Sequence, residues 1–258
     1  MKIFKQTAMI VMMGLLAGCD KDDNQTPVTT PEEDLEITQA AGDSATIITK
    51  LNAFREHAGS PVNTTPGATK GRREINWDAV PAEVTNTNTF PADFFNTIDP
   101  AAAAGRKRGL LYIPANATLR VSDNNFADID PAFATQFKAF SKAKTFSPSG
   151  TNISEIKFQL AGQAKDAYIS SFGIVFLDVD NAQATIVEAY EGNKLIGKAT
   201  ATPSDKKYSF VGIHFHKSKI TRVKITSGNT ALKTGVTDGA TQDVVVIDDL
   251  IYDEPKAY

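Results

Sequence analysis

Through most of the chain, apolar and polar residues alternate with the period of two that half-buried β-strands show. In the clearest example Ile156, Phe158 and Leu160 share one face of a strand. Residues 172–179 are instead apolar on both faces, apart from Asp178, which predicts a strand in the middle of the sheet system. We therefore expect a mainly β protein.

The predicted strands are joined by turns rather than by helices. Gly192 and Asn193 form a two-residue turn of the kind that closes a hairpin. No helix-length amphipathic segment separates the later strands, which favours an antiparallel, jelly-roll-like β-sandwich over a parallel sheet. The predicted strands are 74–78, 110–114, 118–122, 156–160, 172–179, 184–190, 194–201, 207–215, 219–226 and 243–252.

A helical pattern precedes these strands. Its apolar residues recur every three or four positions along one stripe: Ile47, Leu51, Phe54 and Ala58. Asp43 is a suitable N-cap and Gly59 a suitable stop, so we expect a short amphipathic helix over 43–59. The stripe could dock on the folded domain or lie against lipid. Lys50 and Arg55 give the helix little cationic character, which favours docking.

The start of the chain has the pattern of a bacterial lipoprotein. Lys2 and Lys5 precede an apolar stretch over 7–18 that is too short to span a bilayer, and the stretch ends in LAGC at Cys19. We expect residues 1–18 to be a cleaved signal peptide and Cys19 to carry lipid that holds the protein at a membrane. The alternative is an ordinary secreted protein with a buried free cysteine.

The residues after the lipobox predict where the protein lies. DKDD at 20–23 resembles the acidic export signal that places lipoproteins on the outer surface in one large phylum of Gram-negative bacteria. We therefore expect an outer-membrane lipoprotein exposed on the cell surface, with a periplasm-facing protein as the alternative. Residues 19–42 begin with a stretch rich in acidic residues and threonine, which predicts a flexible tether. One β-sandwich domain is expected over 71–255.

Composition excludes several classes of partner. Acidic residues number 30 against 27 basic ones, and removal of residues 1–18 with their two lysines would leave a net charge of about −5. Basic clusters are too short to track phosphates, so nucleic acid is not an expected partner. Nucleotide is not expected either, because GNKLIGKA at 192–199 lacks the Ser or Thr of a P-loop and enters a strand. The single cysteine excludes a disulfide scaffold.

Four aspartates are candidate metal ligands. Asp178 and Asp180 lie two residues apart at a strand end, so both carboxylates should leave the same face. Like charges so close repel unless a cation lies between them, and Ca²⁺ accepts several carboxylate oxygens. The last strand adds Asp248 and Asp249, one of which must point inward, and we expect a calcium site. The alternative is a purely ionic or hydrogen-bonded role, and Arg72, Arg73, Arg120 and Arg222 are available as ion-pair partners.

Catalysis and transition-metal binding have less support. The chain contains neither a Gly-x-Ser-x-Gly elbow nor a His-Glu-x-x-His helix, and no enzyme is expected. His214 and His216 lie on one face of a strand, close enough to share a metal ion. Two ligands do not make a site, and His57 lies far away in sequence. A polar pair on a sandwich face is therefore the favoured interpretation.

Aromatic residues supply the candidates for ligand binding. The stretch 85–109 has no regular period, and long loops of this kind often carry function. Phe94 and Phe95 within it, and Tyr168 and Tyr190 beside strand ends, could stack on a sugar ring.

Four motifs in the same order resemble an uncharacterised family of secreted bacterial proteins, some anchored by sorting tails. They are GRREINWD at 71–78, PADFFN at 91–96, FGIVFLDVD at 172–180 and DVVVIDDLIY at 243–252. The resemblance covers about 45–255 and implies a β-sandwich like that of carbohydrate-binding modules. This chain departs from the pattern in its lipobox and in the histidine pair at 214 and 216.

The tethered sandwich, the aromatic loop and the lack of catalytic motifs predict a lipid-anchored surface protein that binds a glycan or another surface polymer. Two alternatives stay open. One is a structural or assembly lipoprotein that binds only protein partners, and the other is a secreted hydrolase with converging carboxylates.

Overall fold

The computed structural model describes residues 34–113, 118–236, 238–239 and 241–258. The expected signal peptide, Cys19 and the tether as far as residue 33 lie outside these residues. Within the described parts of the chain, no helix is long and apolar enough to cross a membrane.

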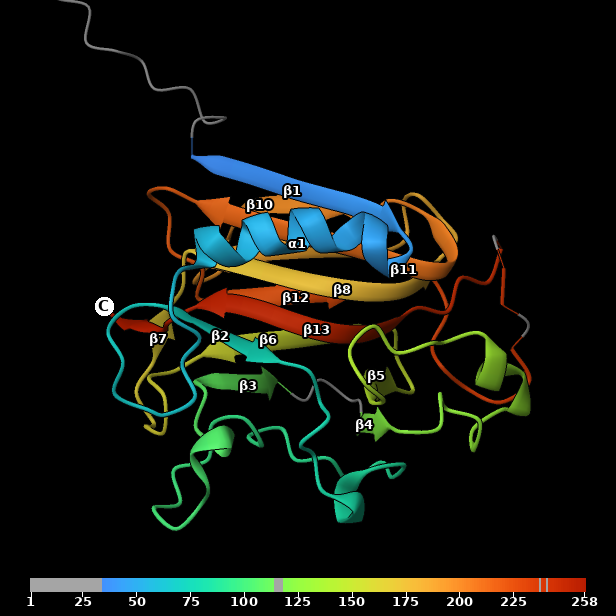
Figure 1. Cartoon of the computed structure of the whole chain (residues 1–258), viewed down its shortest axis with the longest axis horizontal. Helices are drawn as coiled ribbons and strands as arrows, with labels where there is room; N and C mark the ends of the chain where they lie inside the picture. The colour runs from blue at the N-terminus through green and yellow to red at the C-terminus, as the bar shows by residue number, and fades with distance from the viewer. Residues whose placement is uncertain (1–33, 114–117, 237, 240) are drawn as a thin grey trace, which may run out of the picture. The chain divides into compact units, whose positions relative to one another are not determined.

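Two antiparallel sheets form a jelly-roll-like β-sandwich, as the alternating pattern predicts (Figure 1). The larger sheet has seven strands in the order β1-β11-β8-β13-β5-β4, with β2 paired to β13. Its strands are β1 (Leu35–Gly42), β2 (Arg72–Ile75), β4 (Thr118–Ser122), β5 (Thr145–Ser149), β8 (Ser171–Val179), β11 (Ser204–Phe215) and β13 (Val246–Asp253).

The smaller sheet has five strands in the order β10-β9-β12-β6-β3. Its strands are β3 (Leu110–Ile113), β6 (Ile153–Phe158), β9 (Ile186–Glu191), β10 (Lys194–Thr200) and β12 (Arg222–Thr226). A separate short pair consists of β7 (Ala167–Tyr168) and β14 (Lys256–Ala257). Short 3₁₀ helices cover Ala82–Val84, Ala104–Arg106 and Pro131–Thr135. From β8 to β13 the chain passes repeatedly between the two sheets, which ties them together.

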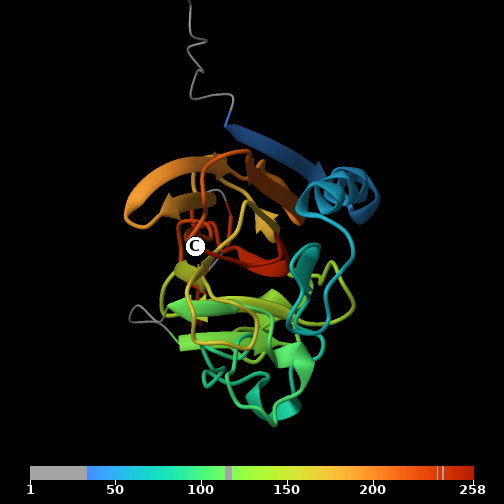
Figure 2. The same cartoon turned by 90° about the vertical axis from the view of Figure 1, so that its left-hand side faces the viewer.

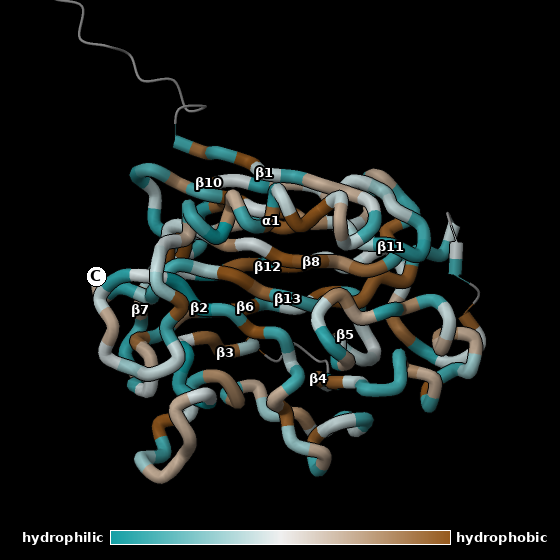
Figure 3. The backbone as a smooth tube through the Cα atoms, viewed as in Figure 1, coloured by the Kyte–Doolittle hydropathy of each residue, from teal (hydrophilic) through white to brown (hydrophobic). Residues whose placement is uncertain are grey.

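Both faces of the seven-stranded sheet are buried. Phe172, Ile174 and Phe176 of β8 point into the core between the sheets, whereas Val175 and Leu177 point to a second core on the outer face. This confirms the central position predicted for the strand over 172–179. Figure 3 shows the apolar residues concentrated along β8, β12 and β13.

The outer core is covered by α1 (Ser44–Ala58), which confirms the predicted helix and its docking on the domain (Figures 1 and 2). The side chain of Asp43 caps the helix by accepting a hydrogen bond from Thr46 N at 2.9 Å. Phe54 packs directly on Gly173 and Gly212, where an added Cβ would lie only 2.6 and 2.5 Å from its ring. The two glycines therefore let the helix approach the sheet closely.

The expected tether over 19–42 differs from the structure at its end. Leu35–Gly42 forms β1, an edge strand whose eight residues pair antiparallel with β11. Its local signal is weak because both faces are partly exposed, with Ile37 at 43%. Pairing with a strand far away in sequence supplies the hydrogen bonds that the local pattern does not reveal. β5 was also not predicted, because its sequence TFSPS contains a proline, which is uncommon within strands.

Irregularities interrupt β8 and β13 near their aspartates. Asp178 has a φ of 64°, a left-handed conformation that is uncommon for a residue with a side chain. The alternation of β8 breaks at this point. Asp178 does not belong to the core between the sheets, whereas the next residue, Val179, does. In β13 the register shifts between Ile247 and Leu250, which allows two adjacent aspartates to fit at that point.

Candidate functional site

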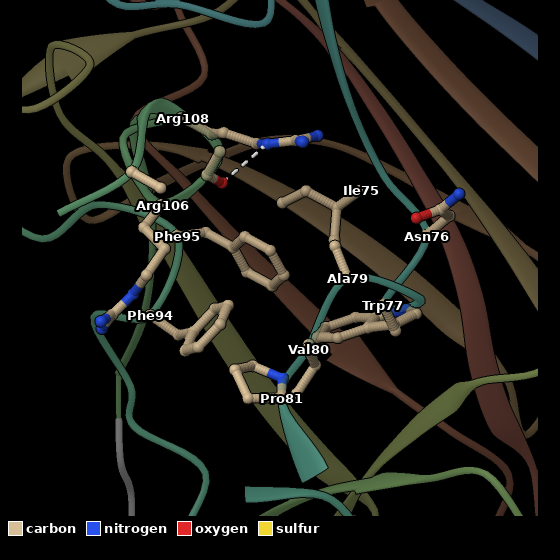
Figure 4. A pocket seen from close by; sticks show the side chains of 12 residues that line it. Ile75, Asn76, Trp77, Ala79, Val80, Pro81, Phe94, Phe95, Arg106 and Arg108 are labelled. Carbon is tan, nitrogen blue, oxygen red and sulfur yellow. Dashed lines mark hydrogen bonds between the residues drawn. The ribbon is translucent and has the colours of Figure 1, made fainter. Parts of the chain in front are cut away.

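An apolar pocket of about 240 Å³ lies between the loop after β2 and the long loop that precedes β3. Figure 4 shows the rings of Trp77, Phe94 and Phe95 around it, with Val80 and Pro81 closing one side. Phe94 and Phe95 are each 6% exposed and meet edge to face, with their ring centroids 5.1 Å apart. They are therefore walls of a pocket rather than an open platform on the surface.

Trp77 connects this pocket to the core. Its ring stacks on Phe146 with centroids 4.3 Å apart and planes at 7°, and its Nε1 donates to Asp248 O at 2.7 Å. The indole is only 1% exposed, so its main role is core packing. Its φ of 66° turns the chain sharply after β2, which brings the following residues to the pocket wall.

Two arginines give the pocket a cationic side. The guanidinium of Arg106 lies 4.6 Å from the centroid of the Phe94 ring, and its buried Nε has no hydrogen-bond partner among the described residues. Arg108 donates from Nε to Gly105 O at 2.9 Å and from Nη1 to Glu74 O. The pocket therefore combines aromatic walls with two guanidinium groups at its edge. No acidic residue is among the described residues that line it.

A second site lies where β8 ends, beside the loop that leads to β13. Asp178, Asp180 and Asp238 each place a carboxylate oxygen within 4.8 Å of the other two. Asp178 is fully buried, and its Oδ1 accepts a hydrogen bond from Lys206 N at 2.5 Å. Its Oδ2 has no partner among the described residues. A buried oxygen without a partner is costly, and a bound cation could satisfy it.

Neighbouring hydrogen bonds hold the three aspartates in place. Asp243 accepts from the backbone nitrogens of Asp180 and Asn181 at 3.2 and 3.1 Å, which fixes the turn after β8. Asp238 accepts from Val244 N at 2.7 Å. The cluster is thus built on backbone contacts between two chain segments that lie about 60 residues apart.

The carboxylates of this cluster repel one another when they are ionised. Burial, and then the charges of Asp238 and Asp180, raise the pKa of Asp178 to about 7. Burial and neighbouring carboxylates also raise the pKa values of Asp180 and Asp238. Burial, followed by the charges of Asp180 and Asp238, raises the pKa of Asp243 to about 6. The triad could hold a metal ion, which would neutralise this repulsion.

Asp248 and Asp249 do not join this group. Asp248 Oδ2 accepts from Phe140 N at 2.6 Å, and the hydroxyl of Ser141 donates to both carboxylates at 3.1 and 2.6 Å. Asp249 Oδ2 also lies 3.8 Å from Nη2 of Arg55, an arginine outside the four expected partners. Burial, and the charge of its neighbour, raise the pKa of Asp248. Within the described structure these two aspartates serve as hydrogen-bond acceptors that fix the loop containing Ser141.

No protein-family model and no curated protein sequence matches this chain.

The two candidate tyrosines lie away from the pocket, and cations cover their rings. The guanidinium of Arg222 lies 4.0 Å from the centroid of Tyr190, whose hydroxyl donates to Glu188 at 3.1 Å. Lys219 Nζ lies 4.6 Å from the centroid of Tyr168, which also packs against Tyr258. The structure thus separates them from Phe94 and Phe95.

Sequence reasoning missed three residues that matter for these sites. Asp238 belongs to an irregular segment with no motif, and it reaches Asp178 only because the loop folds back. Arg106 and Arg108 were visible as a short basic cluster, but only their position beside Phe94 and Phe95 gives them a role in a pocket.

Proposed function

We propose that this chain is a lipid-anchored surface protein whose β-sandwich binds an acidic glycan through the pocket lined by Trp77, Phe94, Phe95, Arg106 and Arg108. The anchor is Cys19 in the lipobox-like sequence, and the site of action is the outer surface of the outer membrane. The observation that carries the proposed ligand is Arg106, whose guanidinium lies against the Phe94 ring and whose buried Nε has no acceptor among the described residues.

The pocket's dimensions and chemistry favour a sugar that carries a carboxylate. A volume of about 240 Å³ is below the range of roughly 300–1,000 Å³ that drug-sized ligands occupy, so one sugar unit at a chain end fits better than an extended polymer. The apolar face of a sugar ring packs on aromatic side chains, and a guanidinium fork matches a carboxylate. Glycoside hydrolysis needs paired carboxylates, which the described pocket lining does not supply.

A binding assay with matched variants tests the glycan proposal. The full chain, purified in detergent, would be titrated with oligosaccharides that end in a uronic acid and with their neutral counterparts. We expect binding of the acidic sugars and a loss of tenfold or more in Arg106→Gln, because the variant lacks the charge. Lys107→Gln removes the neighbouring charge outside the pocket and is expected to bind normally. Failure to bind acidic sugars, or equal losses in both variants, would contradict the proposal.

We further propose that the ion of the aspartate triad is Ca²⁺. Three carboxylates form an all-oxygen donor set, which hard cations prefer, and the loose geometry of calcium tolerates a site built partly from a loop. The observation that supports an ion there is the buried Asp178 Oδ2, which has no hydrogen-bond partner in the described part of the chain.

Thermal unfolding tests the calcium proposal. A ligand that binds only the folded state stabilises it by about 2.7 kcal/mol at a concentration of 100 times Kd. We expect Ca²⁺ to raise the Tm of the full chain relative to chelated protein, and Asp180→Asn to reduce this shift. Asp93→Asn, at an exposed position outside the triad, is the matched control. An equal Tm with and without Ca²⁺ would contradict the proposal.

A further inference from the structure

The only three histidines of the chain come together at one end of α1. The ring centroids of His57 and His214 lie 5.6 Å apart, and those of His214 and His216 lie 4.8 Å apart. His57 is far from His214 and His216 in sequence, but the fold places it beside them. We propose that His57, His214 and His216, together with Glu36, bind Zn²⁺ or a similar divalent transition-metal ion.

The fold explains why these residues meet. Directly opposed residues in an antiparallel sheet share a face, and His214 lies opposite Glu36 on β1 and opposite Ser171 on β8. His216 follows two residues later and returns to the same face. α1 packs on that face, and its last turn carries His57. Three chain segments therefore contribute to one cluster beside a pocket of about 340 Å³.

In the structure no three of these four side chains bring ligand atoms within 4.8 Å of one another, so a tetrahedral ion requires them to rotate inward. Glu36 lies between two rings, with Oε1 3.6 Å from His57 Nε2 and Oε2 4.0 Å from His216 Nε2. Ligand atoms about 2.1 Å from zinc in a tetrahedron lie about 3.4 Å from one another. The side chains of Glu36, His57 and His216 are 43%, 45% and 51% exposed, so they can rotate inward without disturbing the core.

His214 is the fixed member of the cluster. Its Nδ1 lies 2.7 Å from the hydroxyl of Ser171, a residue that is only 1% exposed. Asp253 Oδ1 holds this strand end by accepting from the backbone nitrogens of Ser170 and Ser171. A histidine that uses one ring nitrogen for such a contact presents the other to a metal ion, which is the usual arrangement around metal-ligating histidines.

The charge around the cluster is compatible with a cation. Glu36 supplies the carboxylate of the cluster and lies between the rings of His57 and His216. Lys256 also lines the pocket, but its Nζ is paired with Asp253 Oδ2 at 3.0 Å. Lys70 is an exposed residue at the same pocket.

The ligand chemistry distinguishes this site from the aspartate triad. Imidazole nitrogens suit zinc, copper and nickel, whereas carboxylates alone suit calcium and magnesium. Four protein ligands complete a tetrahedron, which is the pattern of a structural rather than a catalytic zinc site. Bound zinc would connect β1, α1 and β11 and so fix the edge strand to the domain.

Calorimetric titration with ZnCl₂ tests the proposal. The full chain, without an affinity tag and purified in detergent, would be titrated in buffer containing excess Ca²⁺ to occupy the aspartate triad. We expect one Zn²⁺ per chain, binding at least tenfold weaker in His216→Ala and in Glu36→Gln. Glu56→Gln, an exposed change on the same helical turn as His57, should bind as the unaltered chain does. Asp238→Asn should also leave zinc binding unchanged.

Imidazole NMR resonances provide a second readout. Because the chain has three histidines, their ring signals can be assigned with single variants. Zinc is expected to shift all three sets of signals at one equivalent. Absence of zinc binding would overturn the proposal, as would binding that survives His216→Ala or that leaves the imidazole signals in place. Melting of each variant without metal checks that the fold is intact, which is expected because the side chains of Glu36 and His216 are 43% and 51% exposed.

Discussion

Arg73 and Glu254 form a buried bidentate ion pair, in which Nε and Nη2 of the arginine each lie 2.6 Å from a carboxylate oxygen. Their side chains are 0% and 2% exposed. Glu254 Oε2 also accepts from Asn63 Nδ2 at 2.8 Å, and Arg73 Nη2 donates to Thr65 O at 2.9 Å. The pair therefore fixes the loop between α1 and β2 to the end of the last long strand.

Breaking this pair should destabilise the fold strongly. Glu254→Gln leaves the Arg73 charge buried without its partner, and we expect a loss of about 3–5 kcal/mol in the free energy of unfolding. Glu155→Gln removes a more exposed pair with Arg222, and its cost should stay below about 1 kcal/mol. Urea unfolding of both variants measures the difference. Similar midpoints for the two variants would contradict the interpretation.

The ion-free protein should lose stability as pH rises from about 4 to about 7. The carboxyl of Asp178 has an ordinary pKa of 3.8 when unfolded, and burial with its acidic neighbours raises the pKa to about 7 in the folded state. Between these values the folded state holds more protons, so deprotonation disfavours it.

Calcium should reverse this trend, because it binds the ionised carboxylates. We expect the Tm difference between calcium-loaded and calcium-free protein to be small near pH 5 and larger near pH 8. Melting curves at several pH values measure it. An equal calcium effect at both ends of this range would show that the aspartates do not control binding.

The single tryptophan should report on the pocket. Trp77 lines the pocket but is only 1% exposed, so its emission should be that of a buried indole and acrylamide should quench it weakly. Phe94→Ala removes one pocket wall and should increase quenching, whereas Phe133→Ala lies in the outer core and should change it less. Binding of an acidic sugar should decrease quenching in the unaltered chain.

Close packing of α1 on the sheet should depend on glycine. Gly212→Ala places a Cβ 2.5 Å from the ring of Phe54, and overpacking of this kind costs about 1–3 kcal/mol. In a Phe54→Ala background the same change should cost much less, and a double-mutant cycle measures this coupling. Gly105→Ala is the control, since its nearest described neighbour is the flexible end of Arg108 at 3.8 Å. Additive effects of the two substitutions would contradict the packing argument.

The sequence pattern was sufficient to predict an element where a single segment shows the period of a helix or a strand. The cap and apolar stripe predicted α1, and the alternating residues predicted β6, the β9–β10 hairpin and the central position of β8. These features depend on the periods of the helix and strand, which can be counted along the chain. The two-face burial of β8 was also visible because apolar residues occupied consecutive positions.

The sequence by itself determined the mainly β architecture, the helix and the residue types available for binding sites. Only the tertiary structure decided which of these residues meet. It paired β1 with β11, placed Asp238 beside Asp178, and made Phe94 a pocket wall next to Arg106. It also brought His57 to the histidine pair on β11. The physical reason is that sheet register and loop closure join segments far apart in the chain, so no local period carries that information.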